Sequence, residues 1–151
     1  MTNRQYVLEA MKRSSKLAAM AVQEKASTMT GTELYAEDAY IPAFKAACAK
    51  MSMLDRSVGF VCKTPAERIV RLLQPYDSTI YTQDPEELPE RWAFVWSTDP
   101  AKARPFIALS PYPYNTGDCC THDGKTWRSG QDGNVAIPGT VGANWEEVVE
   151  A

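Results

Sequence analysis

The sequence predicts an α+β protein in which an N-terminal helical region is followed by two small antiparallel three-stranded β modules. Residues 3–29 are strong helix formers without Pro or Gly, which predicts one long helix. Near the other end, Asp123-Gly124 lies between two β-favouring runs, a strong hairpin signal. A faint match between residues 59–95 and 117–148 predicts a tandem repeat of the β unit.

These observations divide the chain into four segments. Residues 1–55 are expected to form a helical oligomerisation or attachment region, 56–96 a first β module, 97–111 a linker and 112–151 a C-terminal β domain. A length of 151 residues with 44% hydrophobic content suits one ordinary domain or two small ones.

The N-terminal helix is predicted to carry a narrow apolar stripe with several small side chains. Its apolar positions follow steps of three, four or seven residues: Leu8, Met11, Ala18, Val22 and Met29. Such a stripe can lie on the chain's own β modules, or it can associate with other copies in a dimeric or trimeric stalk. Fraying of the helix is a third alternative.

Two shorter helical pieces are expected to follow. Thr32 can cap a piece that continues through Tyr35 and Asp38. A second helix is predicted from Ala43 to Leu54, with a core-facing stripe at Phe44, Ala47, Cys48 and Met51.

The C-terminal hairpin is predicted to pair Cys119–Thr121 with Lys125–Ser129. A hairpin alone is only marginally stable, so Trp145 and Val148 are expected to supply a covering strand. Alternation along a strand predicts that one of Cys119 and Cys120 is buried and the other half exposed.

The predicted repeat aligns this unit with residues 59–95. Gly59 and Cys62 correspond to Gly117 and Cys120, Val70-Arg71 to Trp127-Arg128, and Trp92 to Trp145. Thr64–Arg68 takes the place of the tight turn. Between the units, Phe106–Leu109 is predicted to form one apolar strand.

The order of C-terminal residues resembles the chitin-binding-like carbohydrate-binding modules of types 5 and 12, above all the versions carried by tailed-phage and prophage virion proteins. The matching positions are Tyr114, Gly117, Asp118, Cys120, Gly124, Lys125, Trp127, Pro138 and Trp145. Runs such as LLQPYDSTIY and WSTDPAKARPFIALS are similar to a phage protein type in which this module follows a helical region. The resemblance implies Cys120, Trp145 and, in the repeat, Trp92 as the structural core.

Glycan binding by such modules requires exposed aromatic rings with polar neighbours. The candidate stacking residues are Tyr112 and Tyr114, with Trp127 as a third that is expected to lie largely inside the module. The candidate polar contacts are Arg128, Gln131, Asp132 and Asn134.

Composition argues against several other functions. A net charge of −3 does not favour nucleic acid as the main partner. No run reaches the roughly 18 apolar residues of a membrane span, and residues 1–15 lack the apolar centre of a signal peptide. We therefore expect synthesis in a cytoplasm, and the resemblance to phage modules implies that this is a bacterial host's and that the final place is the virion. The four cysteines lack zinc-ligand spacing, so no metal or cofactor is expected, and disulfides are doubtful.

No pattern predicts a catalytic residue. The single histidine, His122, falls in the hairpin turn, where a solvated side chain is the better interpretation. Carboxylates that could pair for glycoside hydrolysis occur in segments that resemble loops or termini: Asp77, Asp84, Glu86, Glu87, Glu146 and Glu147. Phosphate-cradling glycine loops are absent from the sequence.

The favoured hypothesis is a non-enzymatic virion protein of a tail, fibre or head fibre, whose C-terminal module contacts bacterial surface polysaccharide. One alternative is a purely structural docking or oligomerisation protein of the particle, and another is a small phage inhibitor of a host protein. The expected partners are further copies of the chain, in a trimer, and other virion proteins.

Overall fold

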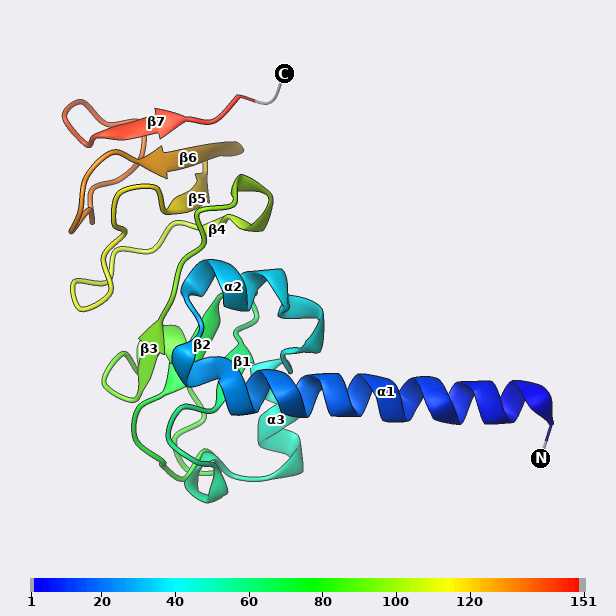
Figure 1. Cartoon of the computed structure of the whole chain (residues 1–151). Coiled ribbons are helices and arrows are strands. Elements are labelled where there is room, and N and C mark those ends of the chain that lie inside the picture. Colours follow the sequence, from blue (N-terminus) through cyan, green and yellow to red (C-terminus); the bar gives the residue numbers. More distant parts are fainter. Residues whose placement is uncertain (1, 150–151) are drawn as a thin grey trace.

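The computed structural model describes residues 2–149, and it confirms the α+β class (Figure 1). Three helices, α1 (Asn3–Lys25), α2 (Gly31–Ala36) and α3 (Phe44–Lys50), precede two sheets. The first sheet is antiparallel, with the order β1 (Val61–Lys63), β2 (Ile69–Leu72) and β3 (Trp92–Phe94). The second has the order β4 (Arg104–Pro105), β5 (Cys119–His122), β6 (Lys125–Ser129) and β7 (Trp145–Glu147).

The long helix α1 begins and ends where the residues favour it. The hydroxyl of Thr2 accepts a hydrogen bond from the backbone N–H of Gln5, and the side-chain oxygen of Gln5 accepts one from the backbone N–H of Thr2, which completes a capping box. After Lys25 a 3-10 turn (Ala26–Thr28) ends the run. The guanidinium of Arg71 on β2 then donates to the carbonyls of Ala26 and Met29, so the end of the helix is fixed to the first sheet.

The helix α2 begins two residues earlier than predicted. Thr30, not Thr32, caps α2, because its hydroxyl accepts from the N–H of Glu33 while the Glu33 carboxylate accepts from the N–H of Thr30. The hydroxyl of Thr32 instead forms hydrogen bonds with the hydroxyl and the backbone N–H of Thr98, which precedes the second sheet in the chain. The third helix starts close to its predicted position but ends at Lys50, four residues before the predicted end and ahead of a 3-10 turn over Met53–Asp55. Of its predicted core-facing stripe, Phe44 and Ala47 are buried, whereas Met51 is exposed.

The second sheet contains one strand more than predicted. Its extra strand β4 runs parallel to β5, with Arg104 beside Cys120 and Pro105 beside Thr121. The predicted strand Phe106–Leu109 is wrong, since pairing ends one residue after β4 with the bond from Phe106 N–H to the Thr121 carbonyl. The segment expected as a linker, 97–111, thus contributes β4 to the sheet.

The two sheets have the same register at the aligned positions. Cys62 pairs with Val70 as Cys120 pairs with Trp127. In the next pair of strands, Trp92 lies opposite Leu72 as Trp145 lies opposite Ser129. This agreement supports the predicted tandem repeat, which stays a prediction because register describes geometry and not origin.

Two further details match between the sheets. Gly59 and Gly117 both have a positive φ, 92° and 95°, and their N–H groups donate to the carbonyls of Leu72 and Ser129. An isolated parallel bridge between Ala43 and Lys63 also stands beside β1 where β4 stands beside β5.

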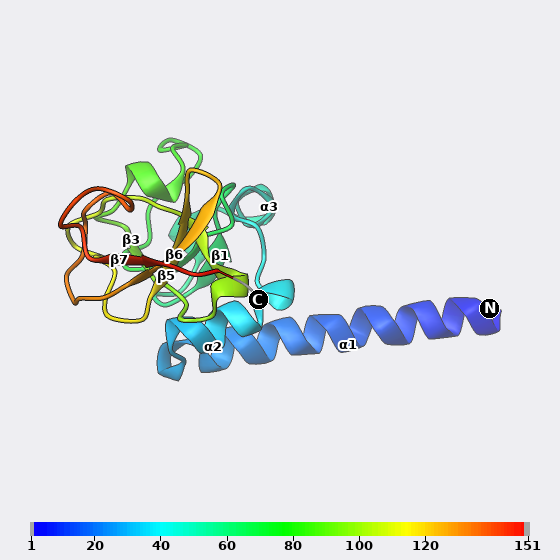
Figure 2. The same ribbon diagram turned by 90° about the horizontal axis from the view of Figure 1, so that it is seen from above.

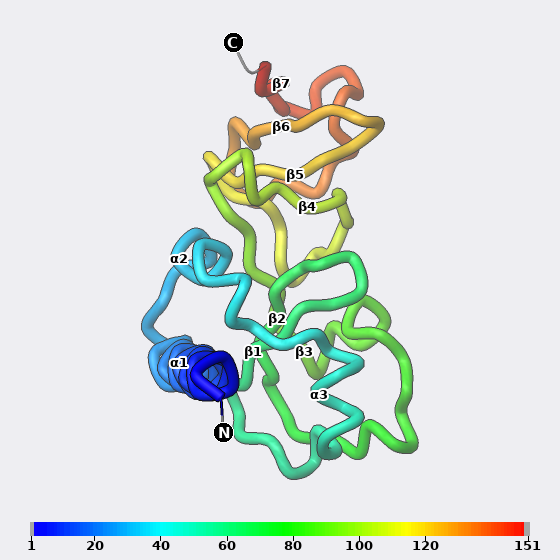
Figure 3. Tube along the Cα trace, turned by 90° about the vertical axis from the view of Figure 1, so that its right-hand side faces the viewer, coloured from blue at the N-terminus to red at the C-terminus, as the bar shows by residue number. Residues whose placement is uncertain are grey.

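Both faces of the first sheet are covered. On one face, Val61 and Ile69 pack with Val22, Ala26 and the α2 residues Leu34 and Tyr35, together with Ile41. The other face belongs to a larger cluster that continues into the second sheet through Trp96, Tyr114 and Cys120. One core therefore crosses both sheets, which stand one above the other in Figure 3.

Candidate functional site

Tyr114, a predicted stacking residue, is fully buried between the two sheets. Its ring is stacked on Trp96 with centroids 4.3 Å apart and on Phe106 at 5.6 Å, while Trp145 meets it edge-on at 5.2 Å. The Tyr114 hydroxyl accepts a bond from the N–H of Ile107, and burial raises the pKa of that hydroxyl. The prediction that Tyr114 contacts a glycan is wrong for this structure, because no face of the ring is open.

Asn134 is also fully buried and holds the loop between β6 and β7. Its amide group donates to the hydroxyl of Ser129 and to the carbonyl of Ala143, at 3.1 and 3.0 Å, and its oxygen accepts from the N–H of Ala136. Its backbone pairs with that of Tyr114. The predicted ligand contact is thus a structural amide.

The other predicted contacts do not gather on one surface. Trp127 and Arg128 are neighbours on β6 and therefore point to opposite faces of the sheet. The Trp127 ring is half-buried, packs against the core and donates from Nε1 to the carbonyl of His122. Gln131 and Asp132 are exposed, and a bond from the N–H of Thr116 lowers the pKa of Asp132.

Among the hollows described for residues 2–149, only one is lined by a predicted glycan-contacting residue, and that residue is Tyr112. This hollow, of about 340 Å³, is lined by an aromatic and proline-rich wall and by two polar groups: Gly31, Phe94, Val95, Trp96, Pro111, Tyr112, Pro113, Asn115 and Asp118. Burial raises the pKa of Asp118, whose carboxylate accepts from the N–H of Asn115 at 2.8 Å. Asn115 and Asp118 were not among the predicted contacts, although Asn115 follows Tyr114 and Asp118 is one of the positions that carry the family resemblance.

The predicted core residues Cys120 and Trp92 are fully buried, and Trp145 is half-buried against the same cluster. The expectation for Cys119 is wrong: it is buried as well. Its N–H donates to the Ser97 carbonyl, and the turn Pro100–Lys102 packs against β5, so the outer face of this strand is covered too. All four cysteines are free.

The described groups offer little for nucleophilic catalysis. Burial raises the pKa of the Cys120 thiol to about 12 and that of the Cys62 thiol further, so both stay protonated near neutral pH. His122 ends β5 beside a hollow of about 400 Å³ in which Asp123 is the one carboxylate among the lining residues. Within residues 2–149, no three side chains of the metal-ligating types gather closely enough to hold an ion.

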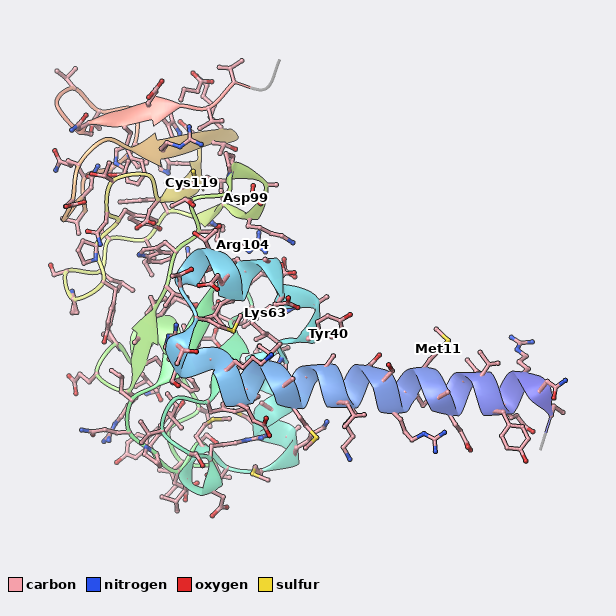
Figure 4. All side chains as sticks on the ribbon, in the orientation of Figure 1. Met11, Tyr40, Lys63, Asp99, Arg104 and Cys119 are labelled. Carbon is pink, nitrogen blue, oxygen red and sulfur yellow. The ribbon has the colours of Figure 1, made fainter. Side chains whose placement is uncertain are left out.

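The first half of α1 carries a series of exposed apolar side chains. Every residue from Thr2 to Leu17 is exposed, and this half of the helix stands clear of the body (Figures 1 and 2). Leu8 is 47% exposed and Met11 61%, and Figure 4 shows Met11 on the free stretch. Of the predicted stripe, only Val22 is buried, because the body covers α1 only from Ala18 onward.

The sequence matches no protein-family model, and comparisons with curated proteins and with solved structures return no significant match. Among the helices of the described residues, none is both long and apolar enough to cross a membrane.

Proposed function

We propose that this chain is a non-enzymatic structural subunit of a phage or prophage particle, joined to its neighbours by the free half of α1. One observation carries the proposal: about four turns of helix project into solvent with large apolar side chains, including Tyr6, Val7, Leu8 and Met11, uncovered. Isolated helices of this length are marginal in water, so such a segment is stabilised mainly by packing against something else.

Several further features support an assembly role over a ligand-binding one. Tyr114 and Asn134 are buried, so the predicted glycan surface loses two of its members. The C-terminal module supports a particle protein through its resemblance to virion modules. We favour packing of the free half of α1 against the same segment of other copies of the chain, in a trimer.

Light scattering on the purified chain tests this proposal. At low micromolar concentration we expect a trimer mass for the parent chain and a monomer mass for the double variant Leu8→Asp/Met11→Asp, with a loss of helical circular dichroism as the free half melts. The control variant Glu9→Gln/Arg13→Gln changes exposed charges on the opposite side of α1 and is expected to remain a trimer. A monomeric parent at high micromolar concentration would refute the proposal.

A second candidate function, binding of bacterial surface polysaccharide, is favoured by the Tyr112 hollow. A half-buried aromatic ring between two prolines, with a carboxylate and an amide nearby, has the components that sugar sites use. A glycan array run with the parent chain and Tyr112→Ala tests it, with Tyr81→Ala as the control for an exposed tyrosine elsewhere. Signals that survive in Tyr112→Ala would place any glycan site outside this hollow.

A further inference from the structure

A second surface is a groove between α3 and the stretch of α1 from Ser15 to Gln23, which lies beyond Leu8 and Met11 along the helix. It has a volume of about 540 Å³ and a mostly apolar lining: Ser15, Lys16, Ala19, Met20, Gln23, Ala39, Tyr40, Ile41, Pro42, Ala46, Ala47, Lys50, Arg56 and Phe60. Met20 and Tyr40 remain exposed at its mouth. Large exposed apolar patches with a polar rim commonly mark interaction sites.

The groove is cationic. Its lining contains Lys16, Lys50 and Arg56 and no Asp or Glu. Arg56 donates one bond to the Ala47 carbonyl and lies over the Phe60 ring at 4.4 Å, but its Nε–H is buried without a hydrogen-bond partner. A buried donor without a partner is costly, so an occupant with carboxylates and apolar side chains fits this groove.

The chain carries a segment with this chemistry. Residues 79–90, here called the acidic loop, contain Asp84, Glu86, Glu87 and Glu90 and no Lys or Arg. At its start, Ile80 is 69% exposed and Tyr81 54%. One carboxylate, that of Glu86, faces Arg68 at 3.7 Å, which leaves the other three for an external partner.

The groove and the acidic loop lie on different sides of the body. Figures 1 and 3 place α1 on one side and the loop, drawn in green, on the other. One molecule therefore cannot join its own two surfaces, whereas two copies can.

We propose that the groove of one copy binds the acidic loop of the next, with Ile80 and Tyr81 on the apolar floor and carboxylates beside Lys50 and Lys16. The two surfaces differ, so the contact is head-to-tail and generates a ring or an open row of subunits. It uses neither Leu8 nor Met11, and it is independent of the proposed contact through the free half of α1.

Two surface variants make the test specific. The groove variant is Met20→Asp/Lys50→Glu, and the loop variant is Ile80→Asp/Tyr81→Asp. All four residues are exposed, so the fold should be retained, which thermal melting verifies. The matched control is Leu54→Asp/Lys45→Glu, which makes the same kinds of change at exposed positions outside the groove.

The variants are made in the Leu8→Asp/Met11→Asp background, and self-association is measured by sedimentation velocity over a concentration series. We expect each variant to weaken head-to-tail association about tenfold or more, and the control to leave it unchanged. When the two variants are mixed, the intact groove of one can bind the intact loop of the other, so a 1:1 pair should form.

The outcome of mixing decides the proposal. Failure of the mixture to pair would overturn the head-to-tail contact and, if the groove variant alone had lost association, would assign the groove to another occupant. Absence of self-association in this background would also overturn it. Neither result would affect the contact through α1, because that contact is read from the parent and from Leu8→Asp/Met11→Asp.

Discussion

The rings of Trp96 and Tyr114 are stacked with an interplanar angle of 18°, and this contact joins the two sheets. Trp96 follows β3 of the first sheet, and Tyr114 precedes β5 of the second. The Trp96 indole also donates from Nε1 to the carbonyl of Tyr112. The sheets are thus connected by a packed aromatic contact in addition to the chain itself.

We expect Tyr114→Ala to destabilise the whole chain by about 3–5 kcal/mol, because it removes a buried ring that contacts Trp96, Phe106 and Trp145. Unfolding by urea should remain a single transition, since one core crosses both sheets. The variant Tyr114→Phe keeps the ring and loses only the acceptor for Ile107, at a cost of about 1 kcal/mol. Two separate transitions in the parent chain would contradict the shared core.

We expect Asn134→Ala to cost about 1–3 kcal/mol, because the carbonyl of Ala143 and the N–H of Ala136 lose their partner in a buried site. Hydrogen exchange should rise in the loop between β6 and β7 and remain slow in the first sheet. Asn134→Asp keeps the acceptor for Ala136 but removes the donor and buries a carboxylate. At neutral pH it should therefore destabilise the chain at least as much as Asn134→Ala does. Unchanged exchange in the loop would show that Asn134 does not hold it.

The variant Trp145→Ala is expected to destabilise the chain by about 3 kcal/mol, the lower end for a large aromatic because the ring is half-buried. The indole donates from Nε1 to the Ala136 carbonyl at 2.7 Å and meets Tyr114 and Phe106 edge-on. Thermal unfolding measures the effect. A melting temperature equal to that of the parent would show that β7 is not closed by this side chain.

High pH should unfold the chain through its buried tyrosines. Burial raises the pKa of Tyr35 to about 12, above the ordinary value of about 10. Because the folded-state pKa is the higher one, the stabilisation is complete below pH 10 and is lost as the pH rises from 10 through 12. Its hydroxyl donates to the Val95 carbonyl and accepts from the N–H of Ile69, so ionisation removes a link between α2 and the first sheet.

Absorbance of tyrosinate and circular dichroism, followed together in an alkaline titration, check this expectation. The late part of the absorbance change should coincide with the loss of structure. The variant Tyr35→Phe lacks this ionisable group and should lose less stability over the same pH interval, although it starts from a lower value. A late absorbance change with intact circular dichroism would contradict the link.

Local signals in the sequence predicted the fold class and many of the elements. Helix propensity predicted α1, which starts at Asn3 as expected and ends at Lys25, four residues before the predicted end. Asp123-Gly124 predicted the β5–β6 hairpin, and the position of Trp145 after the Pro138-Gly139 turn predicted β7. These signals depend on residues close together in the chain or on strand alternation, which tertiary packing left intact. The cap of α2 was missed by two residues because Thr30 and Thr32 both have suitable side chains, and only the bond from Thr30 to Glu33 distinguishes them.

The formation of β4 and the burial of individual aromatic residues depend on the tertiary structure. Arg104-Pro105 has no strand signal of its own and becomes a strand because β5 offers a free edge and Arg68 donates two bonds to the Pro105 carbonyl. An exposed and a buried tyrosine are alike in sequence. Tyr112 and Tyr114 differ only because the second sheet stacks on the first at Trp96, and that contact between distant segments carries no periodic pattern.

Residue types and their spacing therefore determined a helical start, two hairpin-based sheets and the absence of a recognisable catalytic pattern. The packing of one sheet on the other decided which rings form the core and which surfaces remain open. It closed the predicted glycan face at Tyr114 and Asn134, and it left the first half of α1 and the cationic groove uncovered. Burial is a property of the assembled surfaces, and for this reason only the folded chain reveals it.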